Sequence, residues 1–335
     1  MSIRIAHAEL EQRVLDALFK NGFAAEVAAP IARTVAACER DGTLSHGLLR
    51  LPGYIEAVRS GWADGKAAPE VLSKSPSMIV ADARNGFTHL ALSRERARLM
   101  EMARTTGSAI LLIRNAHHFA ALWPDIEDFA VEGFIAMACV TSRARVVGWG
   151  GGKPVFGTNA SAFACPRAGG APIVWDQAAS VMSQGEILVA ARAGRSLPEG
   201  IGVDALGQPT TDPKAVLEGG ALVPFGGVKG ASIAFTVEVL AAALTGSPFG
   251  FESPANGTLP SKGGEFVMVI DPRLAQADVG ARVESLVEAV FAAGSEHLPG
   301  SRRYARRAKA LAEGIALDAH SLEILGRLSS NPLQP

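Results

Sequence analysis

The sequence predicts an α/β protein, and two observations lead to this prediction. The continuous apolar segments 109–113 and 134–141 enclose a helical segment near 125–132. This strand–helix–strand order is typical of an α/β core. Helical segments dominate the first sixty and the last sixty residues, as the spacing of Leu10, Val14 and Leu18 illustrates. We therefore expect both chain ends to join one helical layer.

Three helices are expected in the N-terminal region, and they cover residues 8–20, 24–38 and 45–59. Asn21-Gly22 supplies the break between the first two. The third begins at Ser45 or His46. Pro52 is expected to bend or interrupt it, because proline lacks a backbone donor and clashes with the preceding turn.

Further along the chain, strands and helices alternate. The expected strands are 78–82, 109–113, 134–141, 173–175 and 266–271, and the expected helices are 93–106, 125–132, 230–244, 275–293 and 302–328. Ser93 is a good N-cap for its helix, and Gly107 fits the C-terminal cap. Glycine-rich segments at 148–152, 169–170 and 200–207 predict long functional loops.

Composition limits the class of protein. The chain has 335 residues, of which 48% are hydrophobic and 19% charged, enough for two domains and a large core. The formal net charge of -1 gives no reason to expect nucleic acid or an anionic membrane as a partner. A small anionic substrate can still be bound locally by one or two Arg or Lys side chains.

The three cysteines, Cys38, Cys139 and Cys165, are far apart and form no C-x-x-C pair. A disulfide framework and a zinc site are therefore not expected, and no metal is predicted. The N-terminus has no apolar signal segment, and the apolar runs are too short to span a membrane. We expect a soluble, cytoplasmic protein.

The common nucleotide and hydrolase motifs are missing. Gly148–Lys153 is rich in glycine but fails the third glycine of the Rossmann G-x-G-x-x-G pattern. Gly226–Gly230 lacks the spacing and the Ser/Thr of a Walker A loop. Thr43 stands where the serine hydrolase elbow needs glycine, which opposes a hydrolase with Ser45 as nucleophile.

Five segments in order nevertheless resemble the malate/L-lactate dehydrogenase-like family. They are Arg40–Arg50 (its D-x-x-x-S-H-G-x-x-R motif), Asn115–Phe119, Phe156–Phe163, Ala221–Gly230 and Pro299–Arg303. Each motif alone is weak, but together they span most of the chain. Residues 118–125 and 60–67 look most like the family's Δ1-piperideine-2-carboxylate/Δ1-pyrroline-2-carboxylate reductases.

The resemblance implies an NAD(P)H-dependent oxidoreductase with a mixed sheet unrelated to the Rossmann fold. It implies a helical domain from residues 1–75 and 275–335, an NAD(P)-binding α/β domain at 76–274, and a homodimer. The expected reaction is reduction of a cyclic imino acid to L-proline or L-pipecolate with NADPH, NADH being possible. The alternative is a 2-hydroxy acid dehydrogenase acting on malate, lactate, sulfolactate or ureidoglycolate. A family member that has lost catalysis and only binds ligand is opposed by the intact Ser45, His46 and Arg50.

Ser45 and His46 are the expected catalytic pair, because an imidazole with a near-neutral pKa can donate and recover a proton. A lone histidine at a helix start is more often structural, but the Ser-His-Gly context reverses that preference. The resemblance implies an acidic relay partner, either Asp176 or Glu186. Imine reductases similar to this chain carry Asp where Glu186 stands, and the extra methylene displaces the carboxylate by about 1.5 Å. We expect Glu186 in the relay and Asp176 against the cofactor.

Arg50 is expected to bind the substrate carboxylate, because a guanidinium offers two parallel N–H groups to it. Arg50 lies one turn beyond His46 if the helix is regular; a solvated helix charge is the alternative. Thr158 is expected to add a hydroxyl. The residues expected to bind the cofactor are His118, Phe119, Ala120, Ala121, Leu122, Asp176, Gln177, Ala178, Val228, Lys229, Arg302, Arg303, Arg306 and Arg307. The four arginines are candidates for the 2′-phosphate of NADPH or, equally, one solvated helix face.

Three departures from the family pattern bear on the substrate. Ala160 replaces the usual proline after Gly-Thr-Asn, and Ala179 replaces the threonine of D-x-A-T-S. Residues 141–145, which include two arginines, replace a more neutral stretch.

Overall fold

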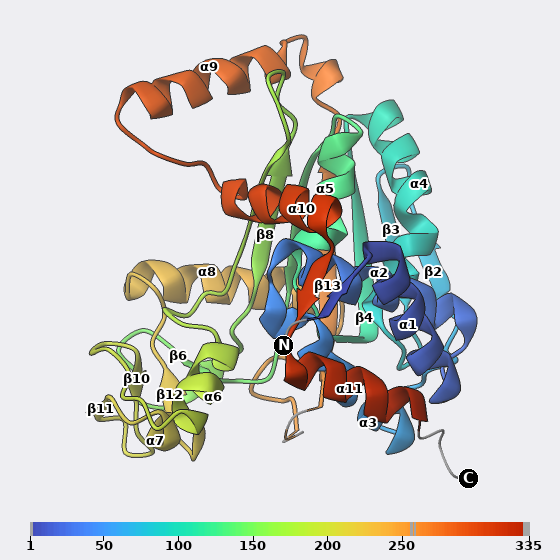
Figure 1. Cartoon of the computed structure of the whole chain (residues 1–335). Helices are drawn as coiled ribbons and strands as arrows, with labels where there is room; N and C mark the ends of the chain where they lie inside the picture. The colour runs from blue at the N-terminus through green and yellow to red at the C-terminus, as the bar shows by residue number, and fades with distance from the viewer. Residues whose placement is uncertain (1–2, 255–256, 258, 331–335) are drawn as a thin grey trace.

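A computed structural model describes residues 3–254, 257 and 259–330 of the chain (Figure 1). Its main sheet has seven strands in the order β2-β3-β4-β13-β5-β8-β9. These are Glu70–Lys74, Met78–Asp82, Ser108–His118, Ser261–Ile270, Ile135–Val140, Ser161–Cys165 and Ile173–Gln177. Only β3 and β4 pair in parallel; the other neighbours in this sheet are antiparallel. The predicted α/β fold with a mixed, non-Rossmann sheet is confirmed.

Helices cover both faces of the main sheet. α4 (Thr88–Thr106) and α5 (Trp123–Val131) pack on one face, and α8 (Val228–Glu238) with the π-helical turn Val239–Ala243 packs on the other. Strand β4 alternates accordingly. Its Leu111 joins the core under α4 and α5, whereas Leu112 joins the core under the π-helical turn. Burial on both faces explains why the central strands read as continuous apolar runs.

The two chain ends form one layer, as the sequence predicts. Strands β1 (Ile3–Ile5) and β14 (Ile315–Leu317) pair antiparallel. The helices of this layer are α1 (His7–Lys20), α2 (Ala25–Asp41), α3 (Leu51–Arg59), α10 (Ser301–Glu313) and α11 (Ala319–Ser330). α1 packs on α11 and α2 packs on α10. Helix α9 (Val279–Ala292) lies apart from them at the top of the molecule (Figure 1).

A second, five-stranded sheet forms a lobe at the lower left of Figure 1. Its order is β11-β10-β12-β6-β7, with bounds Pro209–Thr210, Gly202–Val203, Ala221–Leu222, Val146–Val147 and Pro154–Phe156. α6 (Gln184–Arg192) and α7 (Pro213–Leu217) pack on it around a small core that includes Ile187, Val216 and Leu222. The glycine-rich middle of the chain is therefore not only loops, because very short strands pair across it.

Three expected helices differ in detail. The stretch from Ser45 is not one helix: two 3-10 turns, Leu44–His46 and Leu48–Arg50, precede α3. Pro52 lies in the first turn of α3, where its missing N–H costs little, so it begins the helix rather than bending it. α4 begins five residues before the expected cap Ser93, because residues 90–92 are buried and continue its apolar face.

The tail 302–328 is broken at Gly314, which has a φ of +83° and leads into β14. Gly107 closes α4 in the left-handed conformation, as predicted. Among the described residues, no helix is long and apolar enough to cross a bilayer.

Arg307 joins the layer formed by the chain ends to helix α5. Its guanidinium binds Asp41 of α2 at 2.5 Å and Glu127 of α5 at 2.7 Å, and both carboxylates are buried. The ring of Trp123 lies 5.6 Å from the same guanidinium. Arg307 is thus part of the packing rather than of a solvated helix face.

Arg307→Gln is expected to lower the free energy of unfolding by about 3 kcal/mol, because it removes the cation from Glu127 and leaves Asp41 with Arg40 alone. Arg13→Gln removes an exposed pair with Glu9 and is the matched control, with a loss below about 1 kcal/mol. Urea unfolding measures both. Equal losses in the two variants would contradict the structural role of Arg307.

Candidate active site

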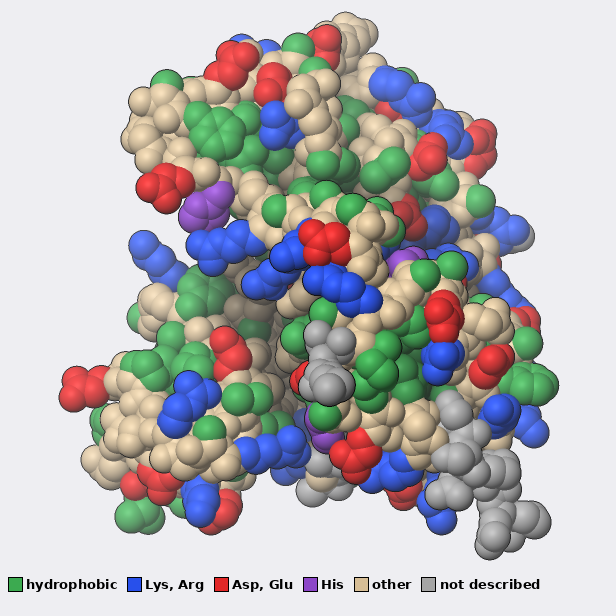
Figure 2. Space-filling model, in the orientation of Figure 1, with side chains coloured by type: hydrophobic (Ala, Val, Ile, Leu, Met, Phe, Trp, Pro, Cys, Tyr) green, Lys and Arg blue, Asp and Glu red, His purple; other side chains and the backbone are tan. Residues whose placement is uncertain are grey.

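A cavity of about 660 Å³ lies between the small-sheet lobe and the rest of the molecule. Figure 2 shows this side of the molecule, with a hollow beside the lobe and Lys and Arg side chains gathered over α10. Thirteen of the residues predicted for the site line the cavity: Ser45, His46, Arg50, His118, Phe119, Ala120, Ala121, Leu122, Thr158, Asp176, Gln177, Ala178 and Glu186. Segments from four distant parts of the sequence therefore meet in one place.

Ser45 and His46 lie on the first 3-10 turn, and Ser45 Oγ is 3.0 Å from His46 Nδ1. The turn is held from below by Glu39, whose carboxylate accepts the Leu48 N–H at 2.7 Å. A side chain at Gly47 would collide with that carboxylate, so this position requires glycine. Burial lowers the pKa of His46 to about 3, with the charges of Arg50 and His118 adding to the effect. His46 is therefore neutral in this cavity, and its surroundings disfavour the protonated form.

Arg50 is placed by the second 3-10 turn and not by a regular helix, so the expected one-turn relation to His46 is wrong. Its guanidinium stacks on the ring of Phe119 at 4.5 Å. Its Nε is buried and has no hydrogen-bond partner among the described residues. Burial lowers the pKa of Arg50, but an arginine stays protonated. A largely buried cation without a carboxylate is the feature that most directly indicates an anionic ligand.

Thr158 faces the same cavity from the segment that follows β7. Its backbone N–H donates to Ser142 Oγ at 3.0 Å, and its own Oγ1 lies 3.2 Å from that atom. The next residue, Asn159, is fully buried with a φ of +42° and donates to Glu238 at 2.9 Å. These bonds fix the hydroxyl of Thr158 on the cavity wall.

The two candidates for the acidic relay partner are both engaged elsewhere. Glu186 forms a capping box at the start of α6 and accepts hydrogen bonds from the N–H and Oγ of Ser183, each at 2.8 Å. Asp176 accepts the backbone N–H groups of Leu122 at 2.7 Å and Trp123 at 3.0 Å. Neither carboxylate bonds to the Ser–His pair in the described structure. The start of α6 is nevertheless close, because a Cβ at Gly185 would lie 3.6 Å from Ser45 Cβ.

The residues predicted for the cofactor fall into three places. Residues 118–122 and 176–178 line the main cavity. Arg302, Arg303 and Arg306 line a neighbouring cavity of about 540 Å³, and Thr43 lines both. The exposed Val228 and Lys229 begin α8 and line neither, and Arg307 is held in its ion pairs. Two adjoining cavities, one rich in arginine, fit an elongated dinucleotide with phosphates.

Asp125 and Glu265 form a buried cluster with His118 that the sequence reading missed. His118 Nε2 lies 3.1 Å from Asp125 Oδ2. One possible metal-ligand atom from each of His118, Asp125 and Glu265 lies within 4.8 Å of the other two. Burial and the charge of Asp125 raise the pKa of Glu265 to about 8. Burial lowers the pKa of His118, but the bond to Asp125 and nearby carboxylates outweigh it and raise the pKa. The one sequence feature that could have indicated the cluster was Glu265, a charged residue directly before the apolar run 266–270.

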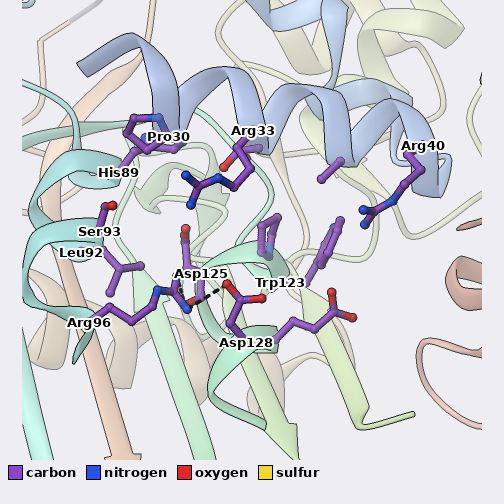
Figure 3. A pocket seen from close by; sticks show the side chains of 14 residues that line it. Pro30, Arg33, Arg40, His89, Leu92, Ser93, Arg96, Trp123, Asp125 and Asp128 are labelled. Atoms are coloured by element: carbon purple, nitrogen blue, oxygen red, sulfur yellow. Dashed lines mark hydrogen bonds and ion pairs between the residues drawn. The ribbon is translucent and has the colours of Figure 1, made fainter. Parts of the chain in front are cut away.

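The cluster separates the main cavity from a small polar one of about 140 Å³, shown in Figure 3. His118 faces the main cavity, whereas Asp125 and His89 line the small one. Arg33 and Arg96 extend toward this space, and Arg96 binds Asp128 at 3.4 Å (Figure 3). The spacing of the three donor groups would admit a small cation. The raised pKa of Glu265 favours its neutral form, which lowers the negative charge of the cluster without a cation.

Comparison with known proteins gives the family. The sequence model described as malate/L-lactate dehydrogenase matches residues 5–325. A Pseudomonas putida protein named Delta(1)-pyrroline-2-carboxylate/Delta(1)-piperideine-2-carboxylate reductase is 47% identical over 331 residues, 97% of each chain. The crystal structure of delta1-piperideine-2-carboxylate reductase from Pseudomonas syringae has a TM-score of 0.95 at 44% identity, over 97% of this chain and 99% of that chain. The (2R)-3-sulfolactate dehydrogenase (NADP(+)) of Chromohalobacter salexigens is 39% identical over 92% of each chain.

Fold, cavity and relatives together define an NAD(P)-dependent oxidoreductase that does not use a Rossmann fold. The chain belongs to the malate/L-lactate dehydrogenase family. The family resemblance predicted from the five sequence segments is confirmed.

Because the pKa of Glu265 is raised, the free energy of unfolding is expected to depend on pH. The unfolded chain ionises this carboxyl near its ordinary value of 4.5, whereas the folded protein keeps the proton up to a pKa of about 8. The folded state therefore binds more protons in this window, and raising the pH favours unfolding. Glu265→Gln cannot ionise, so the wild type is expected to lose stability relative to this variant as the pH rises through the window.

Thermal unfolding of both proteins at about pH 5 and about pH 9 measures this difference. The Tm of the wild type should fall relative to Glu265→Gln at the higher pH. A Tm difference that does not change with pH would show that Glu265 ionises normally.

Proposed function

We propose that this enzyme reduces a cyclic imino acid, Δ1-pyrroline-2-carboxylate or Δ1-piperideine-2-carboxylate, to L-proline or L-pipecolate with NADPH. The observation that carries the proposal is the largely buried, unpaired guanidinium of Arg50 beside the Ser45–His46 pair. The names of the Pseudomonas putida and Pseudomonas syringae relatives support the same substrates. The carboxylate of such a substrate would bind Arg50, with the Thr158 hydroxyl as a second donor.

In this proposal NADPH supplies a hydride to the C=N carbon when it is bound, and the protein positions the ring and manages protons. Residues 118–122 and 176–178 would hold the nicotinamide end, and Arg302, Arg303 and Arg306 the phosphate end. The nitrogen needs one proton besides the hydride. Because His46 is neutral, the iminium form of the substrate would bring that proton, or water would supply it through the hydrogen-bonded Ser45–His46 pair. Glu186 and Asp176 remain the candidates for an acidic residue that acts through Ser45 or His46. We also propose a cytoplasmic homodimer.

The second candidate is a 2-hydroxy acid dehydrogenase. A neutral His46 can accept the proton of a hydroxyl during oxidation, and Arg50 would bind the carboxylate of malate or lactate equally well. The sulfolactate dehydrogenase relative supports this alternative, and its name also supports NADP as the cofactor.

Substrate turnover separates the two candidates. NADPH oxidation is followed by absorbance with Δ1-pyrroline-2-carboxylate, Δ1-piperideine-2-carboxylate, pyruvate and oxaloacetate in parallel, and then with NADH. Rapid oxidation by a cyclic imine and little by the oxo acids is the expected result. Turnover of the oxo acids alone would assign the enzyme to the hydroxy-acid branch.

Substitutions at His46 and Arg50 are expected to act on different kinetic constants. His46→Ala should lower kcat by about 100-fold or more, the usual contribution of a positioned proton-transfer group. Arg50→Ala should mainly raise KM for the imino acid, because it removes a group that binds substrate and transition state alike. Steady-state kinetics of both variants, with circular dichroism as a folding control, tests the assignment. Unchanged constants in both would place the active site elsewhere.

A further inference from the structure

Two more arginines, Arg143 and Arg145, line the main cavity, and the proposed reaction gives them no role. They lie on the segment between β5 and β6, which is partly buried. In the part of the chain that the structure describes, neither guanidinium has a hydrogen-bond or ion-pair partner. Burial lowers the pKa of Arg145, and the neighbouring charge of Arg143 lowers it further.

The segment is fixed and does not swing freely into solvent. The backbone N–H of Arg145 donates to Phe156 at 2.7 Å, and its carbonyl accepts the N–H of Leu222 at the same distance. Ala144 donates to Gly250 at 2.9 Å. Both arginines are thus carried on backbone that is tied to the small-sheet lobe on one side and to the main body on the other.

The same segment borders the substrate end of the cavity. Ser142, next to Arg143, bonds to both the N–H and the hydroxyl of Thr158. The backbone N–H of Arg143 donates to Ser261 Oγ at 3.3 Å, and Ser261 pairs with His118 across β13 and β4. Arg143 and Arg145 therefore lie near Thr158, the proposed second donor to the substrate carboxylate.

The charges in the cavity do not balance. Its two carboxylates are engaged, Asp176 by the N–H groups at the start of α5 and Glu186 by Ser183, and His46 is neutral. Among the described residues, the three guanidiniums of the cavity remain without a carboxylate, and the like charges of the partly buried Arg143 and Arg145 repel each other unless an anion joins them. One substrate carboxylate at Arg50 accounts for only one of the three.

We propose that Arg143 and Arg145 form a second anion subsite, for an oxyanion that the substrate carries in addition to the carboxylate at Arg50. The subsite extends the range of substrates to cyclic imino acids that carry a further carboxylate on the ring, which would bind more tightly than the two monocarboxylates named above. This inference rests on the proposed imine reduction for the identity of the ring. A phosphate of the cofactor has the same oxyanion chemistry, so the test includes an arm for it.

Binding of unreactive aromatic analogues tests the subsite without any turnover. Calorimetry compares pyridine-2-carboxylate with the 2,4-, 2,5- and 2,6-dicarboxylates of pyridine. At least one dicarboxylate is expected to bind the wild type about tenfold more tightly or better, because it gains charge-assisted hydrogen bonds. Arg143→Gln/Arg145→Gln should abolish this gain and leave the monocarboxylate affinity nearly unchanged. Arg192→Gln, an exposed arginine of α6 outside the cavity, is the control and should keep the gain.

Two results would overturn the inference. One is that no dicarboxylate binds better than the monocarboxylate, or that the gain persists in the double variant. The other is that the double variant weakens NADPH but not NADH, which would assign the arginines to the 2′-phosphate. If cyclic imines are not reduced at all but the dicarboxylate gain depends on the arginines, the proposed reaction fails and the subsite stands.

Discussion

The arrangement of the site depends on the carboxylate of Asp176. It projects from the edge strand β9 and accepts two backbone N–H groups at the start of α5, from Leu122 and Trp123. Burial raises the pKa of this carboxyl, while the two N–H groups favour its charged form. The positive end of the α5 dipole adds to that stabilisation. One interaction thus ties the sheet edge to the segment 118–122 that lines the cavity.

The hydrogen bonds of Asp176 also position the residues on either side of Leu122 and Trp123. Phe119, within the fixed segment, supplies the ring on which Arg50 stacks, and His118 bonds behind it to Asp125. Trp123, at the other end, lies 4.5 Å from the guanidinium of Arg303 on the C-terminal helix α10. Residues from the first, middle and last parts of the chain are positioned around one capped helix start. The N-terminal part adds Thr43, Ser45, His46 and Arg50 to a main cavity lined mostly by central residues, and the C-terminal part adds Arg302, Arg303 and Arg306 to the neighbouring cavity.

Sequence patterns predicted the parts of the fold that depend on local signals. The strand at 78–82 is a short apolar run, and Gly107 closes α4 in the left-handed conformation; both predictions are confirmed. The start of α4 was missed because the local N-cap signal at Ser93 was outweighed by burial of the preceding turn. The short strands of the lobe carry no periodicity that a sequence can show, since most are two residues long.

The sequence predicted many of the residues that line the cavity, but not the backbone conformation that places them. The motif from Ser45 to Arg50 selected residues that do line the cavity, yet Gly47 breaks the helix that was expected to align them. Side-chain contacts between residues far apart in the sequence leave no local sequence pattern. Examples are Glu265 beside Asp125 and the ion pairs of Arg307 with Asp41 and Glu127. Whether an arginine binds a ligand or a neighbouring helix is decided by tertiary contacts, and Arg303 and Arg307 differ for that reason.

In the proposed reaction, a hydride moves from the cofactor to the C=N carbon of a cyclic imino acid that the cavity holds by its carboxylate. The reduction of Δ1-pyrroline-2-carboxylate with NADPH that carries deuterium at both positions of the nicotinamide C4 tests this directly, with the product analysed by mass spectrometry and NMR. Proline with one deuterium at the α-carbon is expected. Proline without deuterium at that carbon, or deuterated lactate from pyruvate as the only product, would contradict it.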